Sequence, residues 1–339
     1  MTQAEAEQLE LAKDELRRAS LPGRALTRDD CLKHADKLKG KVVVVTGAGS
    51  GFGRLFATEA GKHGAKLVLS DVNENTVTKV VEAVKEAGGD AIGTQCDVTS
   101  WDSQVKMFRL GADTFGKIDI VVPNAGVTEI HGWFDLKAGP DGEPLASAIP
   151  PPKLTYDVNL LGVMYSCNIA LFHFRQNRSR DKKSIVMIGS MASNFPIPLG
   201  PMYSMAKHGV LGLQRSLHLS LSGERVRTNT ICPWFVKTGI MSFDSLIGTS
   251  GLPLGNIEHV IQAMILAASD DELEGAMLPV DASGAFLIPW DAWLGGSWNY
   301  YRAFEQRAGL LAHITGGIKN NAAGAIGVVL SSIKTRIFG

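Results

Sequence analysis

Tyr203 and Lys207 are the residues whose types and spacing point most directly to chemistry, since they stand four positions apart in Tyr-Ser-Met-Ala-Lys. In a helix, positions i and i+4 lie on one face, so the phenol and the ammonium group would be neighbours. A free tyrosine has a pKa of about 10, and a nearby positive charge lowers it. With Ser190 thirteen residues upstream, the pair predicts a general acid–base tuned toward neutral pH.

A glycine-rich segment earlier in the chain predicts a loop that binds phosphate groups. Four consecutive valines, residues 42–45, indicate a strand buried on both faces. Gly47, Gly51 and Gly53 follow, and they would let backbone N–H groups approach a pyrophosphate at the start of the next helix. Their spacing is Gly-x-x-x-Gly-x-Gly rather than Gly-x-Gly-x-x-Gly, because residue 52 is Phe. A plain turn would use the same glycines, but the strand before them and the helix after them favour a cofactor loop.

Asp71 indicates which dinucleotide this loop would take. It follows a second predicted strand, residues 66–70, where a carboxylate would bind the adenosine ribose hydroxyls and repel a 2′-phosphate. Ser50, Val72 and Asn73 offer no positive charge to hold such a phosphate. We therefore expect NAD rather than NADP as the cofactor. The alternative for Asp71 is a surface residue that opens a turn and binds no ligand.

These motifs, in this order, resemble those of the short-chain dehydrogenase/reductase family over residues 38–288. Residues 46–53 resemble the family's cofactor loop, Asp97-Val98 its adenine-contacting pair, and Asn124-Ala125-Gly126 the segment that steadies the sheet under the cofactor. Within the family, the segments most like the 15-hydroxyprostaglandin dehydrogenase type are 207–210, 231–233 and 275–278.

The resemblance implies an NAD-dependent oxidoreductase with a single doubly wound Rossmann-type α/β domain. The family's catalytic tetrad matches Asn159, Ser190, Tyr203 and Lys207. In the implied reaction, Ser190 and Tyr203 hydrogen-bond a secondary alcohol, Tyr203 takes its proton as hydride passes to NAD, and Asn159 holds a water beside Lys207. The residues implied to contact the cofactor are Gly47, Ser50, Gly51, Phe52, Gly53, Asp71, Asp97, Val98, Asn124, Ala125, Gly126, Tyr203, Lys207, Pro233, Val236 and Thr238.

Composition agrees with a globular enzyme. The chain has 339 residues, of which 45% are hydrophobic and 20% charged, and a formal net charge of zero gives no case for nucleic-acid binding. Its four cysteines have no metal-binding or redox spacing, so we expect reduced packing residues and no metal site. The polar N-terminus is unlike a signal peptide, and no apolar run approaches about 18 residues, so we expect a cytoplasmic protein.

The elements that must position these residues alternate along the chain. We expect strands near 41–46, 66–70, 91–96, 119–123, 184–189, 227–232 and 276–280, and helices near 52–63, 74–87, 102–115, 154–178, 203–222 and 256–269. Such alternation predicts right-handed crossovers and a parallel sheet whose ligands collect at the carboxyl ends of the strands. Asp71, Asn124, Ser190 and Thr238 each follow a predicted strand, so we expect them at one edge.

Three regions surround this core. Residues 1–37 predict an N-terminal helical extension, residues 239–256 a flap over the substrate, and residues 289–339 a C-terminal extension. The tail from 306 to 339 carries four basic and no acidic residues. Its packing on the protein itself is favoured over peripheral membrane contact. The family resemblance implies a homodimer or homotetramer paired through helices like 154–178 and 203–222.

The substrate is inferred from the flap and from the aromatic residues after the last strand. The segment 239–247 has no Lys or Arg, and Trp290, Trp293, Trp298, Tyr300 and Tyr301 follow at 290–301. We expect a bulky, mostly uncharged apolar alcohol or ketone, although these aromatics would equally suit packing against the N-terminal helix or a second subunit. Two other functions stay open: a biosynthetic ketoreductase using NAD(P)H, and a non-catalytic NAD(H)-binding regulator. The presence of both Tyr203 and Lys207 counts against the regulator.

Overall fold

The computed structural model describes residues 23–129, 141–142, 153–195, 197, 200–236 and 253–289, all within one compact unit. The segments expected to form the N-terminal helix, nearly all of the flap and the C-terminal tail lie outside these residues, as do Thr238 and the aromatic group at 290–301. Among the described residues, no helix has the length and apolar character needed to cross a membrane.

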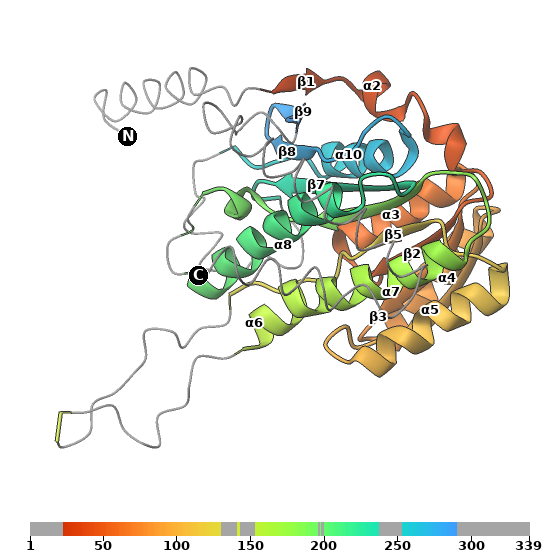
Figure 1. Cartoon of the computed structure of the whole chain (residues 1–339), viewed down its shortest axis with the longest axis horizontal. Coiled ribbons are helices and arrows are strands. Elements are labelled where there is room, and N and C mark those ends of the chain that lie inside the picture. The colour runs from red at the N-terminus through yellow and green to blue at the C-terminus, as the bar shows by residue number, and fades with distance from the viewer. Residues whose placement is uncertain are drawn as a thin grey trace, which may run out of the picture. The chain divides into compact units, whose positions relative to one another are not determined.

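A central sheet of nine strands carries the fold (Figure 1). The strands are β1 (Arg24–Leu26), β2 (Val42–Thr46), β3 (Lys66–Asp71), β4 (Asp90–Gln95), β5 (Ile120–Val122), β6 (Lys183–Ile188), β7 (Val226–Pro233), β8 (Met277–Asp281) and β9 (Gly284–Leu287). Their spatial order is β1-β9-β8-β7-β6-β5-β2-β3-β4. The seven expected strands are present and mutually parallel, which confirms the doubly wound α/β class.

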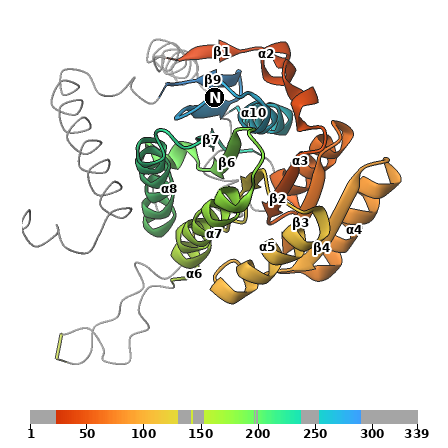
Figure 2. The ribbon, with the colours of Figure 1, turned by 45° about the vertical axis from the view of Figure 1, so that its right-hand side comes forward.

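Helices cover both faces of the sheet (Figure 2). The α-helices are α2 (Arg28–Leu32), α3 (Gly51–Lys62), α4 (Glu74–Glu86), α5 (Trp101–Phe115), α6 (Leu154–Tyr156), α7 (Gly162–Gln176), α8 (Pro201–Ser220) and α10 (Ile257–Ser269). Shorter turns are the 3₁₀ helices η1 (Ala35–Leu38) and η3 (Met191–Ser193) and the π-helix η2 (Asp157–Leu161). One buried cluster includes residues of α3, α4 and α10, and the other includes residues of α5, α7 and α8.

Strand β2 shows why this sequence forms a two-sided core. All five of its residues are buried. Val43 and Val45 join one cluster and Val42 and Val44 the other, because successive side chains of a strand point to opposite faces. Helix α3 complements one face with buried residues at positions 53, 56, 57, 60 and 61, the spacing of one helical stripe.

The antiparallel edge formed by β1 and β9 was absent from our sequence expectations. Strand β9 returns after a turn in which the Asp281 carboxylate accepts the Ser283 N–H at 2.7 Å, and β1 pairs with β9 from Arg24 to Leu26. Cys31 and Ala35, in the stretch that joins β1 to β2, enter the buried core. Part of the segment we assigned to an N-terminal extension therefore packs as an edge of the sheet.

Candidate active site

The order in which successive strands are added to the sheet reverses between β2 and β5. The candidate site lies at the carboxyl ends of these neighbouring strands. The strand order runs outward from this pair on both sides, which is where α/β sheets open a crevice for ligands. At this point the Thr46 hydroxyl accepts the backbone N–H groups of Asn124 and Ala125 at 3.0 and 3.1 Å. The Asn124 side chain donates to the carbonyls of Thr46 and Gly47 at 2.9 and 3.1 Å. These bonds attach the segment after β5 to the glycine loop.

The glycine loop has the space and the donors that a pyrophosphate requires. Gly47 and Gly51 have φ of 64° and 51°, a conformation that favours glycine. A Cβ at Gly51 would meet no described atom within 4 Å, so the start of α3 is open to a ligand. The first turn of α3 contains Gly51, Phe52 and Gly53, whose N–H groups have no partner inside the helix. These residues fit a dinucleotide.

Gly53 lets α3 start directly against this loop. A Cβ at Gly53 would collide with the Gly47 carbonyl oxygen and would approach the Asn124 amide nitrogen to 2.6 Å. Ser50 is the N-cap residue of α3 with an extended backbone, and its side chain makes no capping hydrogen bond.

Asp71 lies at the end of β3 beside the same loop. Its Oδ2 accepts the Gly49 N–H at 3.0 Å and its Oδ1 accepts the Asn73 N–H at 3.0 Å. Asp97 lies beyond β4, where Oδ1 accepts the Thr99 N–H at 2.9 Å, and Val98 is buried. The carboxylate of Asp71 is thus held at the rim of the glycine loop.

Helix α8 places Tyr203 and Lys207 one turn apart, as the spacing predicted. The Lys207 Nζ lies 5.7 Å from the centroid of the Tyr203 ring and donates to the Ile188 carbonyl at the end of β6 at 2.8 Å. The Ser190 side chain hydrogen-bonds the Tyr203 phenol, and its Oγ accepts the Ala192 N–H at 3.1 Å. The described structure therefore brings the phenol, the ammonium group and the Ser190 hydroxyl together.

Ser193 supports this group, although no sequence motif pointed to it. Its Oγ donates to the Lys207 carbonyl at 2.8 Å and accepts the Ser190 N–H at 3.2 Å. With Ser190 it forms a reciprocal capping box on η3. The spacing Ser-x-x-Ser was the only available signal, and it is common in turns.

The pKa of Tyr203 moves in the direction opposite to our expectation. Although Tyr203 keeps some exposed surface, the protein packed around its phenol desolvates it and raises its pKa, while the Ser190 hydrogen bond lowers it by less. Burial also lowers the pKa of Lys207 to about 8, because the residue is buried and its ammonium group has a carbonyl rather than a carboxylate as its partner. The protein alone therefore does not make Tyr203 more acidic.

Asn159 lies on η2, a π-helical turn inside the region expected as one helix over 154–178. Its side chain is fully buried. Its Oδ1 accepts the Val127 N–H, and its Nδ2 donates to the Val127 carbonyl, each at 2.8 Å. The bulge turns Asn159 toward the segment after β5, and π-helical turns of this kind are frequent at functional sites. A Cβ at Gly126 would lie 3.2 Å from Asn159 Oδ1 and 3.9 Å from Lys207 Nζ, so all three predicted segments meet here.

The strand β7 brings the last predicted cofactor contacts to the same edge. Pro233 ends β7, and the buried Val236 forms an isolated bridge with Gly255. Thr238 lies outside the described residues. Cys232, also on β7, is unpaired like the other three cysteines, and burial raises the pKa of Cys167 and Cys232 to about 12. The cysteines are therefore packing residues, as expected.

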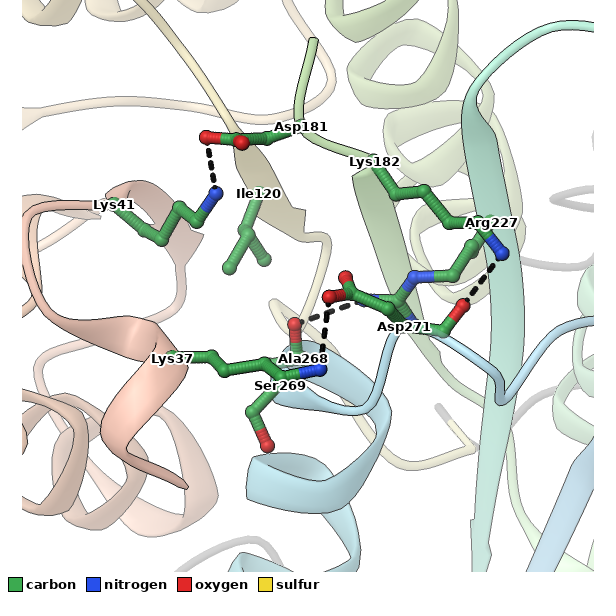
Figure 3. A pocket seen from close by; sticks show the side chains of 9 residues that line it. All are labelled: Lys37, Lys41, Ile120, Asp181, Lys182, Arg227, Ala268, Ser269 and Asp271. Carbon is green, nitrogen blue, oxygen red and sulfur yellow. Dashed lines mark hydrogen bonds and ion pairs between the residues drawn. The ribbon is translucent and has the colours of Figure 1, made fainter. Parts of the chain in front are cut away.

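A cavity of about 270 Å³ lies at the opposite, amino-terminal edge of the sheet (Figure 3). Its lining includes Lys41 before β2, Lys182 before β6 and Arg227 on β7. Lys41 pairs with Asp181 at 2.6 Å. Arg227 donates to backbone carbonyls around the end of α10, among them that of Ala267 at 3.0 Å. These cations have structural partners, and the predicted catalytic residues do not line this cavity.

Comparison with known proteins agrees with the geometry. The short chain dehydrogenase family model matches residues 41–245. The chain is 29% identical to rat 15-hydroxyprostaglandin dehydrogenase [NAD(+)] over 73% of this chain and 92% of that protein. It is 32% identical to the NADP-dependent dehydrogenase M3 of a Phoma species, over 74% of this chain and 77% of the relative.

Solved structures show the same fold. A short chain dehydrogenase from Mycobacterium paratuberculosis bound to NAD has a TM-score of 0.62 at 24% identity, covering 73% of this chain and 98% of that one. The expected likeness to the 15-hydroxyprostaglandin dehydrogenase type is confirmed by sequence. With the family model spanning well over half of the chain, this protein belongs to the short-chain dehydrogenase family of oxidoreductases.

Proposed function

We propose that this protein is an NAD-dependent dehydrogenase that interconverts a secondary alcohol and a ketone on a bulky, mostly uncharged apolar substrate. The observation that carries the proposal is the meeting of Tyr203, hydrogen-bonded to Ser190, with Lys207 beside the segment that is attached to the glycine loop. This arrangement supplies a proton acceptor, a hydroxyl that orients an alcohol oxygen and a buried cation within one site.

Each residue of the tetrad has a separate task in this proposal. Tyr203 takes the proton of the substrate alcohol, or returns it in the reverse direction, and Ser190 fixes the oxygen against the phenol. Lys207 stabilises the phenolate through its positive charge. Asn159 holds the segment after β5 through its paired bonds to Val127. A bound nicotinamide would accept the hydride and, when oxidised, would add the positive charge that offsets the burial of Tyr203.

NAD is proposed as the cofactor because Asp71 faces the loop. Its carboxylate lies within hydrogen-bonding distance of Gly49 N–H, at the rim where the adenosine ribose would lie. The rat relative is named as NAD-dependent, and the Phoma relative as NADP-dependent. The second relative favours NADP as the cofactor, which would suit the alternative function, a ketoreductase working with NADPH. Comparing kcat/KM for the two cofactors tests which of them the enzyme prefers.

Replacing Asp71 by Ala is expected to reduce the preference for NAD. The wild-type enzyme should favour NAD over NADP by at least about 100-fold in kcat/KM, and D71A should reduce this ratio about tenfold or more, mainly by raising the KM for NAD. Asp90→Ala, which removes an exposed carboxylate at the far end of β4, should leave the ratio unchanged. A wild-type enzyme that prefers NADP, or a D71A ratio equal to the wild-type one, would contradict the assignment.

The substrate class rests on the absence of Lys and Arg from the flap segment 239–247, and the hydroxyprostaglandin named for the rat relative supports a bulky substrate. A panel of bulky apolar secondary alcohols, sugars and short polar alcohols tests it by NADH formation at 340 nm. We expect turnover on the apolar set, and turnover on the polar alcohols alone would reject the substrate class while leaving the reaction type intact.

We also propose a cytoplasmic homodimer or homotetramer paired through α7 and α8. Large apolar side chains are exposed on both helices: Met164 by 42% and Phe172 by 61% on α7, and Met205 by 48% on α8. Exposed apolar side chains on both of these helices favour a subunit contact. Light scattering of the purified protein measures the mass, and a monomer at micromolar concentration would argue against the pairing.

A further inference from the structure

The six residues that follow β5, Asn124 to Glu129, tie together the parts of the candidate site. Asn124 binds the glycine loop, as described above. Further on, Val127 is held by Asn159, and the Thr128 carbonyl accepts the Thr155 hydroxyl of α6 at 3.1 Å. The last member, Glu129, accepts the backbone N–H of Tyr203 through Oε2 at 2.6 Å. The segment thus ends on the residue that carries the catalytic phenol.

Helix α8 depends on this distant carboxylate for its first turn. Its N-cap position is Gly200, which has no side chain that could accept a hydrogen bond, and Pro201 has no N–H to donate. Helix N-termini need acceptors from elsewhere and favour negative charge. Glu129 supplies the acceptor from 74 residues away in sequence.

The bond to Glu129 attaches the catalytic turn at Tyr203, in addition to its attachments further along the helix. At the lower end of the turn, Lys207 is held by the Ile188 carbonyl through its Nζ and by Ser193 through its own carbonyl. At the upper end, the described structure holds the Tyr203 backbone through Glu129. Without Glu129 the turn would keep its anchors at Lys207 and at Ser204, whose Oγ accepts the Ile197 N–H at 3.2 Å. The Tyr203 backbone, however, would lose the acceptor that fixes its place relative to Ser190.

The other carboxylate oxygen of Glu129 takes no part in the bond to Tyr203. Oε1 of Glu129 is buried and has no hydrogen-bond partner in the described part of the chain. A buried acceptor without a hydrogen-bond partner destabilises the folded state. A glutamine could make the same bond to Tyr203 with less desolvation, so the bond itself can be separated from the charge by experiment.

We propose that Glu129 is a positioning residue, which fixes the first turn of α8 and thereby the place of Tyr203 in the reaction. The effect on turnover rests on the proposed dehydrogenase function, whereas the effect on the helix does not. The structural part can therefore fail or hold independently of which substrate the enzyme takes.

The test compares three variants of Glu129 in the full-length protein. E129A removes the acceptor, E129D keeps the charge but withdraws the oxygen by one carbon, and E129Q keeps the acceptor without the charge. Hydrogen exchange of peptides covering residues 200–207 measures the helix turn, and kcat and KM for alcohol and NAD measure catalysis. Asp102→Ala, which removes an exposed carboxylate from the first turn of α5, is the matched control.

E129A is expected to speed exchange of the α8 first turn about tenfold and to lower kcat about 10- to 100-fold, with both KM values within about threefold of wild type. E129D should be impaired in the same two measurements, by at least about threefold. E129Q should lie close to wild type in both measurements. D102A should change neither the exchange of residues 200–207 nor kcat.

Several outcomes would overturn the proposal. One is E129A with wild-type exchange in the 200–207 peptides, whatever its activity, since Glu129 would then not hold the turn. Another is E129Q as impaired as E129A, because the charge rather than the hydrogen bond would then matter. If E129A does not fold, E129D and E129Q decide the question. If the wild-type protein oxidises no alcohol, the proposed function fails, and the exchange measurements still test the role of Glu129.

Discussion

Tyr203→Phe is expected to lower kcat for alcohol oxidation by about 1,000-fold or more, because a positioned acid–base contributes up to about 10⁴ to the rate. The substitution removes only the hydroxyl that Ser190 hydrogen-bonds and keeps the ring that lies 5.7 Å from Lys207 Nζ. The dissociation constant for NADH, measured by fluorescence, should stay within about threefold of wild type. Loss of turnover with retained binding is the signature of a residue that acts in the chemical step.

Tyr165→Phe is the matched control. Tyr165, on α7, packs against Trp101 of α5 at a ring-centroid distance of 5.3 Å and takes no part in the proposed chemistry. It should keep kcat within about twofold of wild type. Retained turnover in Y203F would remove Tyr203 as the acid–base, and failure of Y203F to bind NADH would mean that the hydroxyl serves the fold or the cofactor instead.

Lys207→Met is expected to change activity and stability in opposite directions. Turnover should fall by about 100-fold or more, since the phenolate loses its neighbouring charge. Stability at pH 7 should rise by about 2 kcal/mol, because the variant no longer buries an ammonium group whose pKa has been lowered to about 8. The lost hydrogen bond to the Ile188 carbonyl offsets part of this gain.

The pH dependence of stability gives a second measurement on the same variant. The pKa of Lys207 is about 8 in the folded protein, against an ordinary value of 10.5. Below pH 8 both folded and unfolded states carry the charge, so the burial cost is fully present. Between about pH 8 and 10.5 the unfolded state holds more protons, and stability contributed by this site rises with pH. The advantage of K207M should therefore shrink across this window.

Urea denaturation of wild type and K207M at pH 7 and pH 9.5 measures this difference. Lys79→Met, at an exposed position on α4, serves as the control and should show neither effect. A K207M variant less stable than wild type at pH 7 would mean that the carbonyl bond outweighs the burial of the charge.

Much of the fold could be predicted from local patterns. Most of the parallel strands, such as β2 and β5, are short apolar runs, and β2 alternates between two cores as a strand must when both faces are covered. The glycines at 47, 51 and 53 belong to a strand–turn–helix unit whose geometry is set by neighbouring residues alone. The four-residue spacing likewise determined that Tyr203 and Lys207 share a helical face.

Only the tertiary structure decided the features that depend on distant residues. The edge formed by β1 and β9 comes from strands of three and four residues, which are too short to show a period. The π-helical turn at Asn159 carries an amide that bonds the Val127 backbone 32 residues away. Glu129 has no local pattern that connects it with Tyr203, 74 positions later.

The pKa of Tyr203 shows the same division most clearly. Sequence spacing placed a positive charge nearby and predicted a lowered pKa, but the folded protein desolvates the phenol and directs the Lys207 ammonium to the Ile188 carbonyl, so the pKa rises. Sequence patterns determined which groups stand near one another along an element, because helix and strand periods are local. Burial, partner choice and electrostatic sign came from the tertiary structure, because they are summed over every segment that packs around the group.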